Sequence, residues 1–388
     1  MQYLSTDYIV QIGKINDEVI PFILTNMQKV TKMDIKKNPF YILGVSMTDN
    51  KRIILDAADD KMLIMDEGIV EGAKNALLDS KKRLDAELAW FPFLSNDKND
   101  ALILVIDNNF SNSNSLGRMI EYDEVNFQLA MMQTRNFEKS KLPYLFGDDT
   151  LILSIKFEKY ADPDNECFFS LYNKIKNIRQ DADFPEISKE ELLTHLDNRR
   201  AEITADLKNI IDVLPVDYIK FSLIHLTESA THCKSRIRDR ANLLVESLID
   251  TYEIEIQTFI NQQREKIYAL FDVMLSNTYN EQLMNRKIKQ YCDKITNYTI
   301  VWSWVVKPLQ IISLSKGKEH IPTYQILSGI RKVLVTVYKD FNMPELSLNM
   351  LGKLYINGVF EYMPSFHKNA SKDIDMLWKI VWNNRHRK

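Results

Sequence analysis

Apolar residues recur every three or four positions along most of the chain, which is the spacing of one face of an α-helix. The longest run is an apolar stripe made of Ile237, Ala241, Leu244, Leu248, Tyr252, Ile256, Phe259, Ile267, Leu270 and Met274. This stripe predicts a long amphipathic helix or a helical hairpin, and we expect a mainly α fold. Because its apolar positions drift from strict heptads, packing within the chain is favoured over a self-associating coiled coil, which stays open as an alternative.

Residues 38–91 carry the pattern of a short helix followed by two longer ones. Gly44 can adopt the left-handed conformation that ends the short helix. Thr48 or Asp49 is expected to cap the next helix, which should stop near Asp66. The expected apolar face of that helix consists of Ile53, Ile54, Ala57, Ala58, Met62 and Met65.

A third helix is expected from about Ile69 onward. Its inward positions are Val70, Ala73, Ala76, Leu77, Leu84 and Leu88. The pattern therefore predicts two antiparallel helices that share an apolar seam.

Composition divides the chain into three predicted regions. Residues 1–95 hold the lead-in and the helical hairpin, and residues 96–185 form a middle helical region with an Asn/Ser-rich loop at 107–117. Residues 186–388 form a C-terminal helical domain with long amphipathic helices. Ser188 is expected to cap the first helix of that domain.

Two phrases in the hairpin segment resemble the J-domain of DnaJ-type co-chaperones. They are Tyr41-Ile42-Leu43-Gly44-Val45-Ser46 and Asn75-Ala76-Leu77-Leu78-Asp79-Ser80-Lys81-Lys82-Arg83-Leu84-Asp85. In that family, a His-Pro-Asp tripeptide between the two long helices stimulates a DnaK-type ATPase. The corresponding loop here reads Met65-Asp66-Glu67-Gly68-Ile69. The resemblance implies a degenerate J-like module without the tripeptide; an unrelated three-helix segment is the alternative.

The resemblance implies a non-enzymatic, co-chaperone-like adaptor or scaffold. Its partner would be a protein, with a DnaK-type chaperone among the candidates. The expected partner-binding residues are Lys51, Arg52, Asp59, Asp60, Lys61, Asp66, Glu67 and Gly68.

Ten glycines in 388 residues is well below the roughly 7% of average proteins, which favours helices and disfavours Rossmann and P-loop enzymes. No nucleophile or general base stands out in the sequence. His225 and His232 are two helical turns apart, too far for one zinc ion to bridge directly. We therefore expect no enzymatic activity, no cofactor and no metal site.

Two further functions stay open as alternatives. The first is a nucleic-acid-associated helical protein, because cations on one expected helix can contact phosphates. Those cations are Lys234, Arg236, Arg238 and Arg240. The second is an oligomeric structural protein built on residues 221–275. The net charge of −3 excludes polyphosphate binding through bulk charge.

Three widely spaced cysteines and an N-terminus without a signal-peptide pattern predict a cytoplasmic protein. The most apolar stretch, residues 298–314, is interrupted by Lys307-Pro308 and is expected to be a buried core helix. Aromatic residues at helical spacing usually belong to the core. We therefore expect Trp302, Trp304, Trp378 and Trp382 to be buried.

Overall fold

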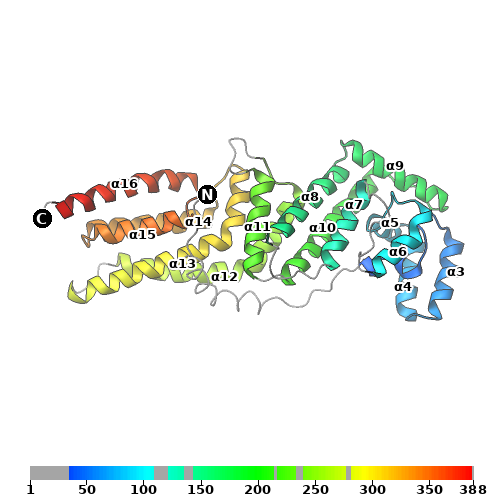
Figure 1. Ribbon diagram of the computed structural model, residues 1–388, viewed down its shortest axis with the longest axis horizontal. Coiled ribbons are helices and arrows are strands. Elements are labelled where there is room, and N and C mark those ends of the chain that lie inside the picture. Colours follow the sequence, from blue (N-terminus) through cyan, green and yellow to red (C-terminus); the bar gives the residue numbers. More distant parts are fainter. Residues whose placement is uncertain are drawn as a thin grey trace. The chain divides into compact units, whose positions relative to one another are not determined.

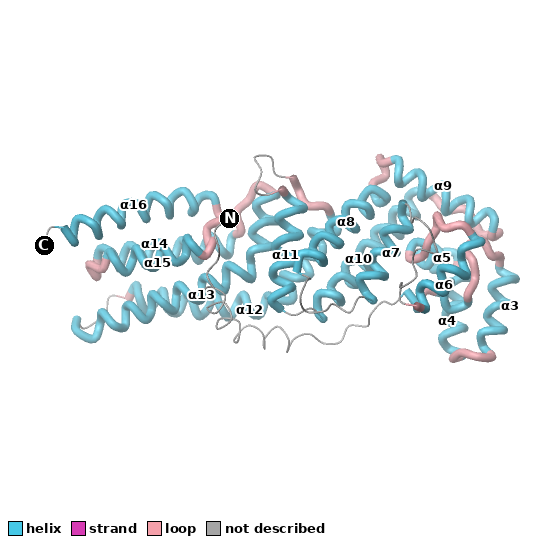
Figure 2. Tube along the Cα trace, viewed as in Figure 1, coloured by secondary structure: helices cyan, strands magenta, loops and turns pink. Residues whose placement is uncertain are grey.

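The computed structural model describes residues 35–108, 121–134, 143–213, 216–232, 239–276 and 281–386. Every regular element in these ranges is a helix, and they contain no strand (Figure 2). The predicted mainly α fold is therefore confirmed. Most of the predicted Asn/Ser-rich loop lies outside the described residues.

The described chain forms two compact units. The N-terminal unit holds the described residues of 35–222 together with Asn242–Leu248, and the C-terminal unit holds those of 223–241 and 249–386. The boundaries predicted near residues 95 and 185 both fall inside the N-terminal unit. Composition marks loops, whereas a compact unit ends where few contacts cross. The Asp85–His195 contact joins residues on either side of both predicted boundaries.

The N-terminal unit is a succession of helices that are mostly short, and α10 is the longest of them (Figure 1). The first group consists of η1 (Ile35–Lys37), α2 (Pro39–Leu43), α3 (Lys51–Met62), α4 (Glu67–Leu78) and α5 (Ser80–Leu88). The next elements are η2 (Asn96–Lys98), α6 (Asn99–Asp107), α7 (Glu121–Thr134), α8 (Pro143–Ala161), α9 (Glu166–Asp181) and α10 (Lys189–Val213). Ser188 caps α10 as predicted, because its hydroxyl accepts the backbone N–H of Glu191 at 3.0 Å.

The seam of the predicted hairpin is formed by α3 and α4, which pack against each other. Their fully or nearly fully buried side chains are Ile54, Ala58, Val70, Ala73 and Leu77. The antiparallel pair is therefore confirmed. The assignment of Ile53 and Met65 to the seam is wrong, since these side chains are 44% and 37% exposed.

The bounds of these helices differ from the predicted ones because Asx side chains cap them at other positions. Asn50, rather than Thr48 or Asp49, caps α3 by accepting the backbone N–H groups of the next turn. The predicted third helix is two helices, because Asp79 takes an extended conformation and caps α5. Gly44 has a φ of 70° and ends α2 as expected.

The C-terminal unit contains the two longest helices of the described chain. Its helices are α11 (Val216–Thr231), α12 (Leu243–Leu275), α13 (Glu281–Ser315), α14 (Ile321–Lys339), α15 (Pro344–Ile356) and α16 (Pro364–His386). The two longest are α12 and α13. Both α11 and α12 begin in the N-terminal unit and continue in the C-terminal unit. The helix α15 packs against both α14 and α16, and α16 also contacts α14 directly through the Tyr324 and Phe366 rings. Figure 1 shows these helices at one end of the view.

From Leu244 to Met274, the apolar stripe found in the sequence lies along α12. Ala241 precedes this helix, and Ile237 lies outside the described residues. The stripe members Ile256, Phe259, Ile267 and Met274 are each at most 3% exposed. These members of the stripe are covered within a single chain, and self-association stays an alternative.

The apolar stretch 298–314 lies within α13, which continues through Pro308 instead of stopping there. Trp302 and Ile311 are fully buried, so the stretch is a core helix as predicted. Beside the proline, the Lys307 ammonium forms an ion pair with Glu361 at 2.7 Å. No helix in the described parts of the chain is long and apolar enough to cross a lipid bilayer.

Candidate protein-binding surface

The end of the α3–α4 hairpin presents four apolar side chains to solvent. Leu63 and Ile64 are 83% and 77% exposed, and Met65 and Ile69 are 37% and 51% exposed. We call these four residues the hairpin tip. The sequence patterns placed Met65 in the buried seam and did not mark Leu63 or Ile64, although three consecutive apolar residues between two helices are an unusual loop composition.

Local hydrogen bonds fix the turn from which these side chains point outward. The helix α3 ends at Met62, and the backbone N–H of Met65 donates to the Lys61 carbonyl at 2.9 Å. The Asp66 carboxylate then caps α4 by accepting the N–H of Ile69 at 3.1 Å. The turn is therefore defined by its backbone, and its apolar side chains have no place in the seam.

Acidic residues of the predicted binding face surround the hairpin tip in sequence and are exposed. They are Asp59, Asp60, Asp66 and Glu67. Gly68 is also exposed, in the first turn of α4. This part of the predicted face therefore combines an apolar centre with carboxylates near it.

The basic residues of the predicted face do not belong to the same surface. Lys51 and Arg52 start α3, whose eleven residue steps to Met62 span about 16 Å. The Lys51 ammonium lies 5.2 Å from the centre of the Phe184 ring, and Arg52 pairs with Asp56 at 4.0 Å.

Lys61 is only partly exposed. Its terminal atoms lie next to Gly44, where a Cβ added to the glycine would be 3.7 Å from the Lys61 Cε. The side chain therefore extends back towards the end of α2. The face predicted as one surface is divided, and its acidic end alone accompanies the apolar tip.

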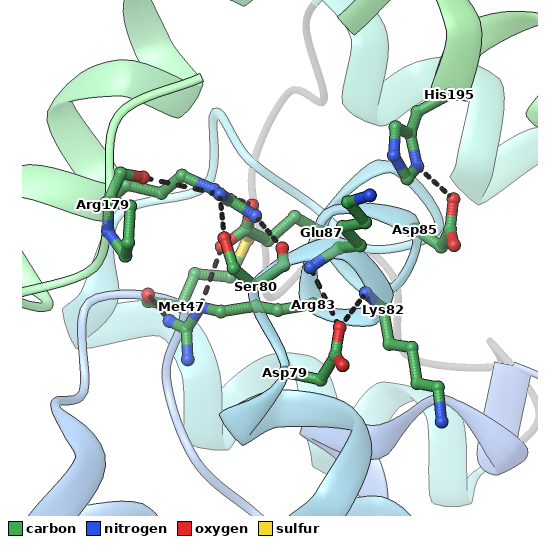
Figure 3. Close-up of polar contacts among 11 residues, drawn as sticks. Met47, Asp79, Ser80, Lys82, Arg83, Asp85, Glu87, Arg179 and His195 are labelled. Carbon is green, nitrogen blue, oxygen red and sulfur yellow. Dashed lines mark hydrogen bonds and ion pairs between the residues drawn. The ribbon is translucent and has the colours of Figure 1, made fainter. Parts of the chain in front are cut away.

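The hairpin is attached to the rest of the unit by a buried charge cluster, made of Arg83, Glu87 and Arg179 (Figure 3). The two Glu87 carboxylate oxygens accept the Nε–H of Arg83 at 2.8 Å and that of Arg179 at 2.9 Å. All three side chains are fully buried. Since Arg83 and Glu87 belong to α5 and Arg179 to α9, the cluster joins the hairpin segment to a helix almost a hundred residues away.

Arg83, which belongs to the second of the two phrases that carry the family resemblance, also contacts the residues on either side of the first phrase. Its Nη2 donates to the Met47 carbonyl, just after the first phrase, at 2.5 Å. Its guanidinium lies 4.0 Å from the centre of the Phe184 ring and 5.4 Å from that of Phe40. Burial lowers the pKa of Arg83, and the Glu87 carboxylate opposes that shift. The cluster has a structural role, because its ionic groups contact each other and are closed off from solvent.

A second connection joins α5 to α10 and α7. The His195 ring contacts the Asp85 carboxylate through Nδ1 (Figure 3). The Asn126 amide donates to the Leu88 carbonyl at 3.0 Å, and its oxygen accepts from Arg199 at 3.0 Å. The base of the hairpin is therefore held by side chains from three other helices, while its tip is exposed.

The candidate nucleic-acid residues are mostly beyond the described residues. Lys234, Arg236 and Arg238 lie outside them, and Arg240 is exposed. The prediction that all four share one helix is wrong for Arg240. Arg240 lies in residues 239–242, which form no helix and precede the start of α12 at Leu243.

The described residues contain no group of three or more His, Cys, Asp or Glu side chains that could hold a metal ion. Comparisons with protein-family models, curated proteins and solved structures each found no match. The J-domain resemblance therefore stays a prediction carried by the two phrases.

Proposed function

We propose that this chain is a non-enzymatic adaptor that binds a protein partner through the tip of the α3–α4 hairpin. The observation that carries the proposal is the exposure of Leu63 and Ile64, at 83% and 77%, on a turn with a capped and hydrogen-bonded backbone. Neighbouring exposed aliphatic side chains cost free energy in water, and contiguous apolar patches rimmed by polar residues are typical of interaction sites.

The charges near the tip indicate the chemistry of the partner. Asp59, Asp60, Asp66 and Glu67 are exposed beside the apolar side chains. A complementary surface would have an apolar pocket or groove with cations at its rim. Such charges affect the association rate and the choice of partner more than the final affinity.

A DnaK-type chaperone is the first partner to test, because the two sequence phrases resemble a J-domain. The order of a short helix, two opposed helices and a following helix supports that choice. Since the loop has no His-Pro-Asp tripeptide, we expect binding without stimulation of the ATPase.

The first experiment measures the affinity of the full chain for a purified DnaK-type chaperone by calorimetry, together with the chaperone's ATPase rate. The variant with Leu63→Ser and Ile64→Ser should bind at least tenfold more weakly than the unaltered chain. Ile356→Ser is the matched control, because Ile356 is 73% exposed and lies in the C-terminal unit. Equal affinity of the tip variant and the control would contradict binding through the tip.

A second experiment covers partners other than a chaperone. A photo-crosslinking amino acid placed at Ile64 of the full chain should capture a discrete protein in cells. The same amino acid at Ile356 should not capture it, and Leu63→Ser in the same chain should reduce the yield. The same products from both positions would remove the tip as a specific binding surface.

A further inference from the structure

The last helix, α16, exposes a row of stacked rings. Trp378 and Trp382 are 54% and 50% exposed. Their rings stack at 5.3 Å with an angle of 18° between the planes, and the His386 ring stacks on Trp382 at 3.9 Å and 25°. We call these three residues the ring ladder. The prediction that both tryptophans belong to the core is wrong.

The ring ladder is not the face by which α16 joins the fold. That face is formed by Ala370, Leu377 and Val381, each at most 8% exposed. Arg385 adds a contact to α15, since its Nε donates to the Glu345 carboxylate at 3.0 Å. The helix is thus packed along one side and carries a second aromatic row along another.

Cations accompany the ladder on the outward side of α16. Lys368, Lys372 and Lys379 are exposed, and at 3.6 residues per turn they project to the side away from the buried row. Within the described chain they form no ion pair. The segment 364–388 holds six Lys and Arg residues and two Asp residues, although the whole chain has a net charge of −3.

Charge and area argue against a second copy of this chain as the occupant. Two such helices would bring like charges together. A half-exposed tryptophan offers on the order of 100 Å², so the two supply far less than the roughly 800 Å² per partner of a stable protein interface.

The ring geometry argues against a nucleic-acid strand. Bases bind to aromatic side chains by stacking on an open ring face. In the ladder, Trp382 already stacks on both Trp378 and His386, so the ring faces that meet in these two stacks are not open to a base. Tryptophan edges combined with nearby cations suit the headgroup region of a bilayer, where both the apolar area and the attraction to anionic lipids contribute to adsorption.

We propose that α16 attaches the C-terminal unit to the surface of an anionic lipid bilayer. Trp378 and Trp382 enter the headgroup region, and Lys368, Lys372 and Lys379 contact lipid phosphates and carboxylates. The helix adsorbs without spanning the bilayer. This activity is separate from protein binding at the hairpin tip.

The test is co-sedimentation of the full chain with vesicles of phosphatidylcholine alone or with about 30% phosphatidylserine. We expect at least tenfold stronger binding to the anionic vesicles, and a loss of most of that binding at high salt. The variant with Trp378→Ala and Trp382→Ala should lose at least tenfold in affinity, as should the variant with Lys372→Glu and Lys379→Glu.

Lys287→Glu with Lys289→Glu is the matched charge control, because both lysines are exposed on α13. It should keep at least half of the vesicle affinity, and the circular dichroism of every variant should equal that of the unaltered chain. Equal binding by the ladder variant and the control would overturn the proposal. So would an unaltered chain that ignores anionic vesicles but binds a single-stranded oligonucleotide or sediments as a dimer in a ladder-dependent way.

Discussion

Removing the charge of Glu87 is the sharpest test of how the hairpin is held. Glu87→Gln keeps the size of the side chain but replaces one carboxylate oxygen with an amide that is itself a donor. The amide would face the Nε–H of Arg83 or Arg179, both of which now donate to Glu87. Two guanidinium groups would then be buried without their shared counter-charge.

The magnitude follows from the two hydrogen bonds and their burial. A hydrogen bond to a charged group contributes about 1.5–3 kcal/mol; because Gln loses one of the two outright and keeps the other without its charge, roughly 3–6 kcal/mol for the pair is an upper bound. Breaking a buried ion pair by removing one partner costs about 3–5 kcal/mol. We therefore expect Glu87→Gln to lower the free energy of unfolding of the N-terminal unit by about 3–5 kcal/mol.

The assay is hydrogen exchange by mass spectrometry across a urea series, because two units need not unfold in one transition. Peptides from α5 and α9 report the cluster directly. Glu345→Gln is the control, since the Arg385–Glu345 pair is exposed and should contribute at most about 1 kcal/mol. If Glu87→Gln lowers the free energy of unfolding by no more than Glu345→Gln does, the buried cluster does not hold the hairpin segment.

A rescue variant separates charge from packing. The triple variant Arg83→Met, Glu87→Leu and Arg179→Met leaves no charge in the buried cluster. Such replacements are often neutral or stabilising. We expect the triple variant to recover most of the stability that Glu87→Gln loses; a triple variant as unstable as the single one would mean that the polar contacts to Met47 and Ser80 matter more than the charges.

Three further predictions concern other parts of the chain. Gly329→Ala should lose about 1–3 kcal/mol in urea unfolding, because its Cβ would lie 2.3 Å from the Phe271 ring; Gly352→Ala, with nothing within 4 Å, is the control. Burial lowers the pKa of His320 from 6.5 to about 4, so the unfolded chain binds the proton first. Stability present above pH 6.5 should fall by up to about 3 kcal/mol as the pH drops to 4, and His320→Gln should flatten that slope. Asp66→Ala should remove the α4 cap, cost about 1 kcal/mol and speed hydrogen exchange in the first turn.

Periodicity predicted the parts of the fold in which one apolar row faces one neighbour. Ile54 and Ala58 on α3 recur at the helical spacing, as do Val70 and Leu77 on α4, and all four are buried. The ends of the helices were harder to predict, because Asn50 and Asp79 each have polar neighbours that could also cap a helix, and the sequence does not rank these candidates.

The same periodicity was wrong for α16 because that helix carries two apolar rows. Leu377 and Val381 form one, and Trp378 and Trp382 form the other. Spacing places residues on a common side of a helix but does not say which side a neighbour covers. The buried charge cluster could not be predicted from the sequence either, since Glu87 and Arg179 become partners only when α5 and α9 pack together.

The two proposed surfaces have opposite charges, and this makes them experimentally separable. Carboxylates accompany the apolar hairpin tip, whereas lysines accompany the ring ladder. An anionic bilayer would attract the second surface and repel the first, so one occupant does not suit both. Because the surfaces belong to different compact units with no shared residue, their variants should act additively. The tip variant should bind vesicles like the unaltered chain, and the ladder variant should retain full affinity for the protein partner; loss of both activities in either single-surface variant would show that the binding sites are not those two surfaces.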